Sequence, residues 1–147
     1  MIRTRRAVAS DAQWLVESSA LYAHETGNER LLPADPNLCG ILWLEAIRDH
    51  VVLIAESGPA PVGFILAWQA PHPFNPALRT LTCGLWYVRP KWRSGRAGLA
   101  LLNAFTEYAD SFADVAYFTL QRASGDASLL RRGFIPTERD FTRWTHR

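Results

Sequence analysis

Three apolar segments follow one another in the middle of this chain, and they limit its possible folds more than any other feature. VVLIAES (51–57), PVGFILAWQA (61–70) and RTLTCGLWYV (79–88) are rich in the β-branched and aromatic residues that favour strands. The turn-rich stretches SGPAP and APHPFNPA join them, with no helix-length segment between. The sequence therefore predicts an antiparallel meander and not a series of parallel βαβ units.

Two helices are predicted before the meander. A strand over residues 2–8 leads into a helix that begins with Ser10 and Gln13 as a capping box and ends near His24. A second helix is predicted over 37–49. The side chains expected to face the core are Trp14, Leu15, Ser18, Leu21 and Tyr22 from the first helix, and Leu38, Ile41, Leu42 and Ile47 from the second.

After the meander, the sequence predicts a helix over 97–112, a strand over 114–121 and a short helix over 125–132. The first of these helices has the most regular apolar spacing in the chain. Ser124 is expected to cap the short helix and Gly133 to end it, and a closing pair of strands is predicted over 134–145.

The composition is that of an ordinary globular protein, and we expect residues 1–147 to form one domain. No apolar run reaches the roughly 20 residues that span a bilayer, and no secretory leader is recognisable, so a cytoplasmic protein is expected. Cys39 and Cys83 lack the spacing of a zinc site or disulfide framework and are predicted to be buried thiols. A net charge of +2 does not by itself indicate a nucleic-acid partner, although arginines cluster near residues 3–6, 89–96 and 131–147.

The junction VRPKWRSGRAGLALL (88–102) connects the last strand of the meander to the helix over 97–112. A helix N-terminus has unpaired N–H groups and a partial positive charge, so it binds anions where small residues let a ligand approach the backbone. Arg93 and Arg96 add cationic side chains, and the remaining residues of the loop are small, namely Ser94, Gly95, Ala97 and Gly98. The junction is therefore predicted to bind a phosphate or a diphosphate.

Gly84 interrupts the third strand of the meander, whose other residues are good strand formers. A glycine there indicates a β-bulge or a close approach by another backbone segment or a ligand. A bulge would splay this strand from its neighbour and expose N–H and C=O groups. An extended ligand that carries amides, such as pantetheine, pairs with groups of this kind.

The strand, the junction from Val88 to Gly98 and the helix after it resemble the acetyl-coenzyme A motif of the GNAT family of N-acetyltransferases. SLLRRGF (128–134) resembles the family's C-terminal segment, so the resemblance covers nearly the whole chain. It implies an α+β fold in α/β/α layers, with about four helices and a mixed, mostly antiparallel sheet of six or seven strands that splays between strands 4 and 5. It also implies acetyl-coenzyme A (acetyl-CoA) as cosubstrate, an amine acceptor and no metal.

Arg93 and Gly98 match the ends of the family's diphosphate motif, Q/R-x-x-G-x-G/A, but Arg96 replaces its middle glycine. One interpretation is that the loop shifts its turn by one residue and uses Gly95. In the other, Arg96 keeps a negative φ and extends its side chain to the diphosphate or the 3′-phosphate. We favour the second interpretation, because a non-glycine residue at positive φ would be strained.

Three residues that are frequent in the family's active sites are missing. Leu129 stands where many members have a tyrosine as general acid, Arg122 stands where many have an asparagine, and TCGLWYV lacks the strand glutamate that serves as general base. A thiolate whose pKa is about 8.5 can leave without full protonation, and Ser128 or Ser124 is a candidate donor through water.

A general base must come from elsewhere, because an amine with a pKa of about 10 is mostly protonated at neutral pH. The loop after the first helix borders the acceptor pocket in this fold, which makes Glu25 and His24 the leading candidates, with His72 as a third. The alternative interpretation of Glu25 and His24 is that they are solvated polar residues at a helix end.

The sequence thus predicts an N-acetyltransferase that moves an acetyl group from acetyl-CoA to a primary amine of a small molecule or peptide by direct attack. The alternatives are a non-catalytic acetyl-CoA-binding sensor or partner-binding module, and a basic nucleic-acid binder. Neither nucleic acid nor a membrane is the expected partner, and a homodimer is expected from the fold alone. The candidate catalytic residues are Glu25, His24 and Ser128, and the candidate cofactor-binding residues are Trp86, Tyr87, Val88, Arg93, Ser94, Gly95, Arg96, Ala97, Gly98, Leu129, Leu130 and Arg132.

Overall fold

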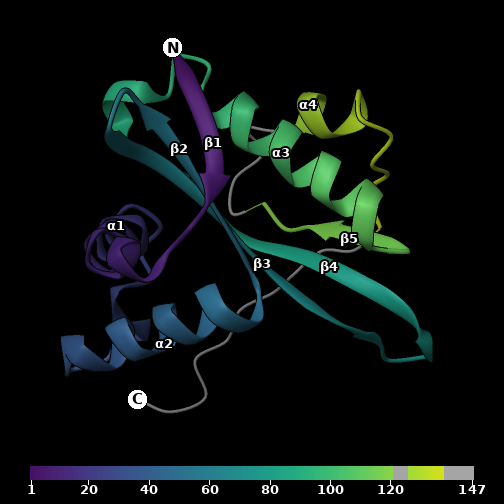
Figure 1. Cartoon of the computed structure of the whole chain (residues 1–147), viewed down its shortest axis with the longest axis horizontal. Coiled ribbons are helices and arrows are strands. Elements are labelled where there is room, and N and C mark those ends of the chain that lie inside the picture. Colours follow the sequence, from purple (N-terminus) through teal and green to yellow (C-terminus); the bar gives the residue numbers. More distant parts are fainter. Residues whose placement is uncertain (121–125, 138–147) are drawn as a thin grey trace.

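The computed structural model describes residues 1–120 and 126–137 (Figure 1). Short 3-10 turns at Ala9–Asp11, Glu29–Leu31 and Pro90–Trp92 separate some of the longer elements. The helices and strands, in chain order, are β1 (Ile2–Arg6), α1 (Ala12–Glu25), α2 (Pro36–Asp49), β2 (Val51–Ser57), β3 (Ala60–His72), β4 (Asn75–Val88), α3 (Ala97–Phe112), β5 (Val115–Phe118) and α4 (Asp126–Leu130).

The strands form one mixed sheet in the order β1-β2-β3-β4-β5. Its first three pairings are antiparallel and the β4–β5 pairing is parallel, which confirms the predicted meander and the mixed α+β fold. Helices α1 and α2 cover one face of the sheet, and α3 and α4 lie on the other (Figure 1). The strand pair predicted over 134–145 is not found in residues 134–137, and its remainder lies outside the described residues.

The hairpin between β3 and β4 is longer than predicted. β3 continues to His72 and β4 begins at Asn75, so most of the proline-rich stretch predicted as a turn lies within the two strands. His72 itself pairs with Asn75 next to a register shift. The hairpin extends well beyond the helices (Figure 1).

The alternating side chains of the strands form two cores, one on each face of the sheet. The core under α3 includes Leu53, Ile65, Leu101 and Phe105. The core under α1 and α2 includes Leu15, Trp43, Ile54, Phe64 and Tyr87. Leu101, Phe105 and Phe64 are fully buried. Helix α3 buries the face that its apolar spacing predicted.

Of the four side chains of helix α2 that were predicted to face the core, Ile47 packs against it and the other three do not. Leu38, Ile41 and Leu42 are 47, 54 and 53% exposed, whereas Trp43 and Ala46 are buried. The large indole of Trp43 packs edge-on against Phe64, and this contact sets the rotation of the helix. In α1, Leu21 is likewise exposed and not part of the core.

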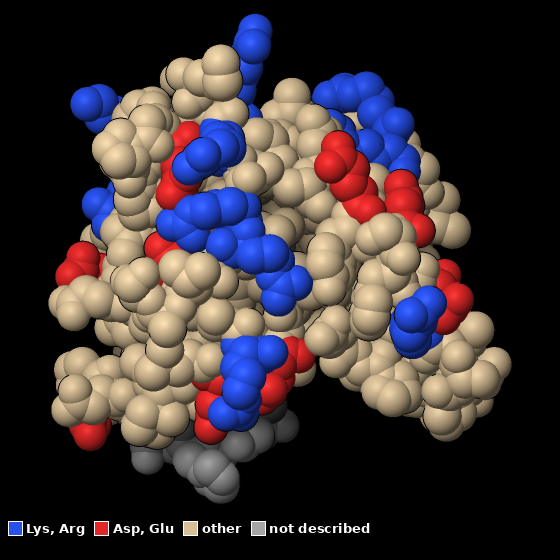
Figure 2. Space-filling view, viewed as in Figure 1, with Lys and Arg blue, Asp and Glu red and all other residues tan. Residues whose placement is uncertain are grey.

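Arginine side chains gather on one face of the molecule. Figure 2 shows Lys and Arg in a band over β1, with carboxylates beside them. Arg3 and Arg5 of this strand pair with carboxylates, and Arg6 donates to His50 O at 2.8 Å and lies over the ring of Tyr108. This arginine cluster therefore makes contacts within the fold.

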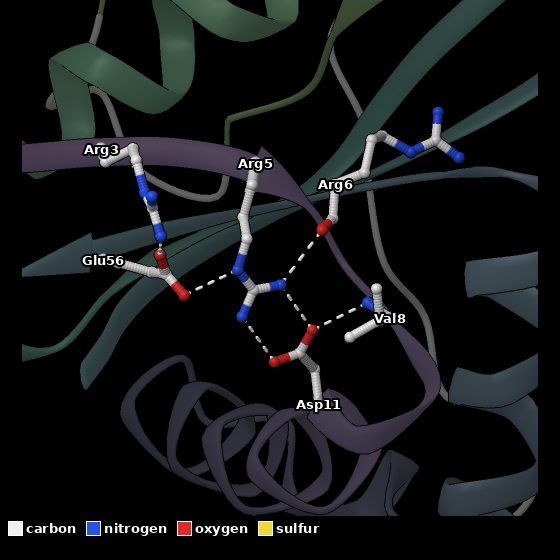
Figure 3. Close-up of polar contacts among 6 residues, drawn as sticks. All are labelled: Arg3, Arg5, Arg6, Val8, Asp11 and Glu56. Atoms are coloured by element: carbon white, nitrogen blue, oxygen red, sulfur yellow. Dashed lines mark hydrogen bonds and ion pairs between the residues drawn. The ribbon is translucent and has the colours of Figure 1, made fainter. Parts of the chain in front are cut away.

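An ion-pair network ties β1 to β2 and to the start of α1 (Figure 3). Arg5 donates two hydrogen bonds to Asp11, at 2.7 and 2.9 Å, and a third to Glu56 at 2.6 Å, while Arg3 donates to Glu56 at 2.9 Å. Asp11 and Glu56 are only 8 and 5% exposed. Hydrogen bonds from these guanidinium groups lower the pKa of both carboxyl groups.

The predicted capping box at the start of α1 is wrong. Ser10 lies within a 3-10 turn, and α1 begins after Asp11 at Ala12. Asp11 accepts the backbone N–H of Val8 at 2.8 Å, so it closes this turn in place of Gln13. Because Arg5 holds the same carboxylate, the start of α1 is anchored to the edge strand of the sheet.

Gly63 of β3 is expected to tolerate no side chain. A Cβ at this position would lie 2.8 Å from the carbonyl oxygen of Tyr87 and 3.1 Å from Cγ2 of Val88, and the backbone oxygen cannot move away cheaply. We expect Gly63→Ala to lower the free energy of unfolding by about 1–3 kcal/mol. Gly40→Ala on α2 is the control, because a Cβ there meets nothing within 4 Å, and it should raise stability by about 0.5–1 kcal/mol. Urea unfolding compares the two, and equal midpoints would contradict the expectation.

Candidate functional site

Strand β4 carries a bulge at Gly84, as predicted. Leu66 of β3 pairs with Leu85 and Ala67 pairs with Cys83, so Gly84 is an extra residue in β4. The position is also crowded, because a Cβ on Gly84 would lie 2.0 Å from Cζ3 of Trp68. The predicted bulge is therefore confirmed, whereas the close neighbour is a side chain and not the backbone segment or ligand of the alternative interpretation.

Strand β5 leaves β4 at the bulge. Thr80 to Cys83 pair with Val115 to Phe118, and the next contact, from Thr119 N–H to Cys83 O at 2.9 Å, ends the ladder. From Gly84 to Val88, no described strand pairs with this edge of β4. The predicted splay between the fourth and fifth strands is thus present.

The open edge of β4 presents backbone N–H groups. Arg89 N–H donates to Val62 O of β3 at 2.8 Å. Because successive residues of a strand direct their N–H groups to opposite edges, those of Val88 and Trp86 face the open edge. The carbonyl of Val88 faces it as well, and accepts Arg93 Nε at 2.8 Å.

The loop between β4 and α3 places several amides at the start of a 16-residue helix. Among the described residues, no acceptor pairs with the N–H groups of Arg96, Ala97 or Gly98. Arg96 has φ −87°, and Gly95 also has a negative φ, so the loop contains no left-handed residue. The negative φ at Arg96 agrees with the favoured interpretation of the altered motif.

Trp86 lies beneath this loop with a buried and unpaired donor. Its indole packs against Phe118 of β5 and lies 3.4 Å from where a Cβ of Gly98 would be. Its Nε1–H is shielded from solvent and has no hydrogen-bond partner among the described residues. A buried donor without an acceptor is costly, and it suggests a site that a ligand completes.

The end of α1 meets the end of β4 through Glu25. Its carboxylate accepts from Arg93 in a short ion pair, and from the hydroxyl of Tyr87 at 3.5 Å. Arg93 also lies over the ring of Tyr87. Burial, followed by the Glu25 charge, raises the pKa of the Tyr87 hydroxyl. The candidate base and the first arginine of the anion-binding loop are thus in direct contact.

His24 and Ser128 occupy less favourable positions. The side chain of His24 is 79% exposed, and its Nδ1 is 2.7 Å from Glu29. Ser128 lies on α4 and accepts from Arg131 at 3.3 Å. His72, at the far end of β3, is 3.2 Å from the hydroxyl of Tyr117 and so lies in the hairpin, not beside α1.

The three candidate cofactor-binding residues on α4 and just after it differ in exposure and contacts. Leu129 is buried, Leu130 is 54% exposed, and Arg132 donates to Asn103 of α3 at 2.5 and 3.2 Å. Gly133 has φ +80° and ends the helical segment, as predicted. Ser124 and Arg122 lie outside the described residues.

The two cysteines differ. Cys83 is fully buried, as predicted, and burial raises the pKa of its thiol. Cys39 is only partly buried, because the rotation of α2 brings it to the wall of a cavity and not into the core. The two thiols are therefore in different environments.

The sequence model of the Acetyltransferase (GNAT) family matches residues 13–134, which is most of the chain. The chain belongs to the GNAT acetyltransferase family. In GNAT terms, β4 with its bulge, the open edge and the loop into α3 are the region that the sequence resemblance identified. No curated protein matches this chain significantly.

Solved GNAT structures share the fold over nearly the full length. A GCN5-related N-acetyltransferase from Ralstonia eutropha JMP134 is 21% identical, with a TM-score of 0.77 over 99% of this chain and 100% of that one. A ribosomal-protein-alanine N-acetyltransferase from Brucella melitensis biovar Abortus 2308 is 19% identical, with a TM-score of 0.69 over 99 and 98%. A predicted acetyltransferase from Clostridium acetobutylicum, solved with acetyl-CoA, is 16% identical, with a TM-score of 0.74 over 97 and 96%. At such identities the likeness concerns the fold.

Sequence reasoning missed one contact at this site and a cavity elsewhere in the fold. The contact between Arg93 and Glu25 joins residues far apart in the chain, and no local pattern indicates it. The cavity beside α2 depends on the rotation of that helix, which the apolar spacing predicted wrongly.

Within the described ranges, no helix combines the length and hydropathy that crossing a bilayer requires.

Proposed function

We propose that this GNAT protein transfers an acetyl group from acetyl-CoA to a primary amine by direct attack. The observation that carries the proposal is the open edge of β4, which runs directly into a loop whose amides at Arg96, Ala97 and Gly98 have no acceptor among the described residues. An extended strand edge suits an amide-bearing chain, and a helix N-terminus suits a diphosphate.

The residues of this region fit the cosubstrate. The unpaired indole N–H of Trp86 and the N–H groups of Trp86 and Val88 would pair with carbonyl oxygens of the pantetheine arm and the thioester. The diphosphate would be held by the loop from Arg93 to Gly98, namely Arg93, Ser94, Gly95, Arg96, Ala97 and Gly98. Tyr87 supports the strand from the opposite face, and Leu129, Leu130 and Arg132 would flank the far side.

Acetyl-CoA supplies an activated acyl group, whose C–S bond breaks as the C–N bond to the amine forms. The amine must reach the carbonyl carbon as the neutral base, so one proton has to leave its ammonium form before attack. A second proton leaves the nitrogen as the amide forms. One of these two protons passes through the general base to solvent and the other reaches the thiolate, so that the products are an amide, a thiol and one released proton.

Glu25 is the general base that the geometry favours. Its carboxylate lies against Tyr87 of β4 and against Arg93, whereas His24 points to solvent. When a diphosphate engages Arg93, the ion pair to Glu25 would weaken and free the carboxylate to contact the amine. Ser128, only partly buried on α4, is kept as a donor to the thiolate through water.

Replacement of Glu25 tests this role. We expect Glu25→Gln to lower kcat by about 100-fold or more, with a small change in the affinity for acetyl-CoA, because the amide cannot take a proton. The loss should shrink as pH approaches the pKa of the amine. His24→Asn is the matched control and should keep kcat. Steady-state rates from pH 6 to pH 10 measure both, and a Glu25→Gln profile identical to that of the wild type would remove the proposed base.

A non-catalytic acetyl-CoA-binding module is the second candidate, and Leu129 favours it, because a buried leucine stands where many GNAT members have their general acid. Thiol release from acetyl-CoA in the presence of an amine panel separates the two functions. Both predict stabilisation by acetyl-CoA, of about 2.7 kcal/mol at 100 times the dissociation constant. Thiol release that depends on an amine supports the enzyme, and stabilisation without release from any amine supports the module.

A further inference from the structure

A cavity of about 490 Å³ lies between α2 and the sheet, on the face opposite α3. This size is within the range of sites for small organic ligands. We call it the α2 cavity. Its walls come from the connection between α1 and α2, from α2 itself and from strands β3 and β4, and its apolar lining consists of Leu31, Leu32, Pro33, Cys39, Leu42, Trp43, Ala46, Leu66, Trp68 and Leu85.

Several large apolar side chains at the α2 cavity are exposed to solvent. Leu31, Leu42 and Trp68 are 66, 53 and 42% exposed, and all three line the cavity. Apolar groups gathered around a hollow, rather than scattered singly, are typical of a binding surface. They would be covered by a ligand with an apolar body.

The α2 cavity adjoins the open part of β4. Trp68 forms its wall and lies against the bulge at Gly84, and Leu85 of β4 lines it. Tyr87 is two residues further along the same face, about 7 Å away, and its hydroxyl donates to Glu25. The α2 cavity therefore lies on the same face of β4 as the contact between Tyr87 and Glu25.

The charges at the α2 cavity favour a cation. Glu45 and Asp49 are part of its lining and lie one helical turn apart on α2, and the other titratable groups of the lining are His50 and Cys39, with no Lys or Arg. Arg48, which is outside the lining, holds Asp49 at 2.7 Å. The lining thus combines an apolar surface with carboxylates, which attract a cationic ligand to this face, while the nitrogen that reacts must lie toward Glu25.

We propose that the acceptor is a small primary amine carried on an apolar, aromatic or aliphatic body, and that the α2 cavity holds this body. This inference rests on the proposed function, because it names the acceptor of that reaction. A polycationic sugar or a polar amino acid would leave the apolar wall formed by Leu31, Leu42 and Trp68 uncovered.

The test measures amine binding without turnover. Calorimetry with protein saturated with coenzyme A would compare 4-phenylbutylamine with ethanolamine, lysine and kanamycin. We expect 4-phenylbutylamine to bind at least about tenfold more tightly than the other three, in proportion to the apolar surface buried. It should also bind better than 4-phenylbutanol, which lacks the charge. Equal or tighter binding of ethanolamine, lysine or kanamycin would overturn the proposal.

Two leucines of α2 give a matched pair of variants. Leu42 lines the α2 cavity and is 53% exposed, whereas Leu44 is 44% exposed and does not line it. Leu42→Gln should weaken 4-phenylbutylamine binding by about tenfold, and Leu44→Gln should leave it unchanged. Equal effects of the two variants would place the ligand elsewhere and contradict the proposal.

Binding of acetyl-CoA to the same variants separates this inference from the proposed function. Both variants should bind acetyl-CoA as tightly as the wild type. If acetyl-CoA binds and amine-dependent thiol release occurs without preference for apolar amines, the acceptor class is wrong and the transferase proposal stands. If acetyl-CoA does not bind to the wild type, the proposed function fails, and the acceptor assignment fails with it.

Discussion

Arg96→Asp is expected to weaken acetyl-CoA binding by at least about 30-fold, while the protein stays folded and becomes no less stable. The variant removes a cation from the loop and puts a negative charge where the diphosphate would lie, and one charge-assisted hydrogen bond is worth about 1.5–3 kcal/mol. Arg96 is exposed and is the residue before α3. A carboxylate at a helix N-terminus stabilises the helix by about 0.3–1 kcal/mol. Affinity and stability should therefore change in opposite directions.

Calorimetry and thermal unfolding measure this pair of effects, and Arg48→Asp serves as the control. It has the same change in charge but lies on α2, on the other face of the sheet. Dephospho-coenzyme A adds a further comparison. If Arg96 contacts the 3′-phosphate and not the diphosphate, the penalty should largely disappear with this ligand. An affinity loss shared equally by Arg48→Asp would mean that overall charge, and not the loop, controls binding.

Asp11→Asn should lower the free energy of unfolding by about 2–3 kcal/mol at neutral pH. The carboxylate is 8% exposed and accepts two hydrogen bonds from Arg5, and an amide leaves this guanidinium partly unpaired. For a chain of this length, the loss corresponds to about 4–12 °C in melting temperature. Asp49→Asn is the control, because its pair with Arg48 is exposed and its loss should have no measurable effect. Similar melting temperatures for the two variants would contradict the importance of the network.

The same network predicts how the stability of the wild type depends on pH. The folded-state pKa values of Asp11 and Glu56 lie below their unfolded values, so both carboxyl groups release protons more readily in the folded protein. Their contribution to the free energy of unfolding is complete above the unfolded-state pKa, near pH 4. It is lost as the pH falls through the lower folded-state pKa values. Urea midpoints from pH 7 to pH 2.5 should fall more steeply for the wild type than for Asp11→Asn. Parallel curves would show that Asp11 does not contribute in this way.

The network also matters for the site. Helix α1 has 14 residues, so its ends are about 21 Å apart. Asp11 anchors one end to β1, and Glu25 meets Arg93 and Tyr87 at the other. A shift at the anchored end would move the carboxylate that we propose as general base.

Local patterns predicted the parts of the fold that depend on local physics. The meander, α3 and the bulge follow from strand propensity, apolar spacing and a glycine in a strand. The loop with its small residues and two arginines was likewise visible in the sequence. Each of these signals is carried by residues close together in the chain.

Long-range packing decided what local patterns could not predict. The apolar residues of α2 fit more than one rotation of the helix, and the contact of Trp43 with Phe64 selected the one that exposes Leu42. The turn before α1 depends on Arg5, which holds Asp11, and not on the capping pattern of Ser10. The α2 cavity follows from the rotation of α2, so it too was hidden from the sequence.

Binding of coenzyme A observed by NMR is the most direct test of the central claim. In ¹⁵N-labelled protein, the indole N–H of Trp86 and the amides of Arg96, Ala97 and Gly98 should shift saturably with a single dissociation constant, because they gain acceptors. The indole N–H of Trp43 already donates to Ser19 at 3.2 Å, so its resonance should not shift. Unchanged Trp86 and loop resonances at saturating coenzyme A would contradict the account.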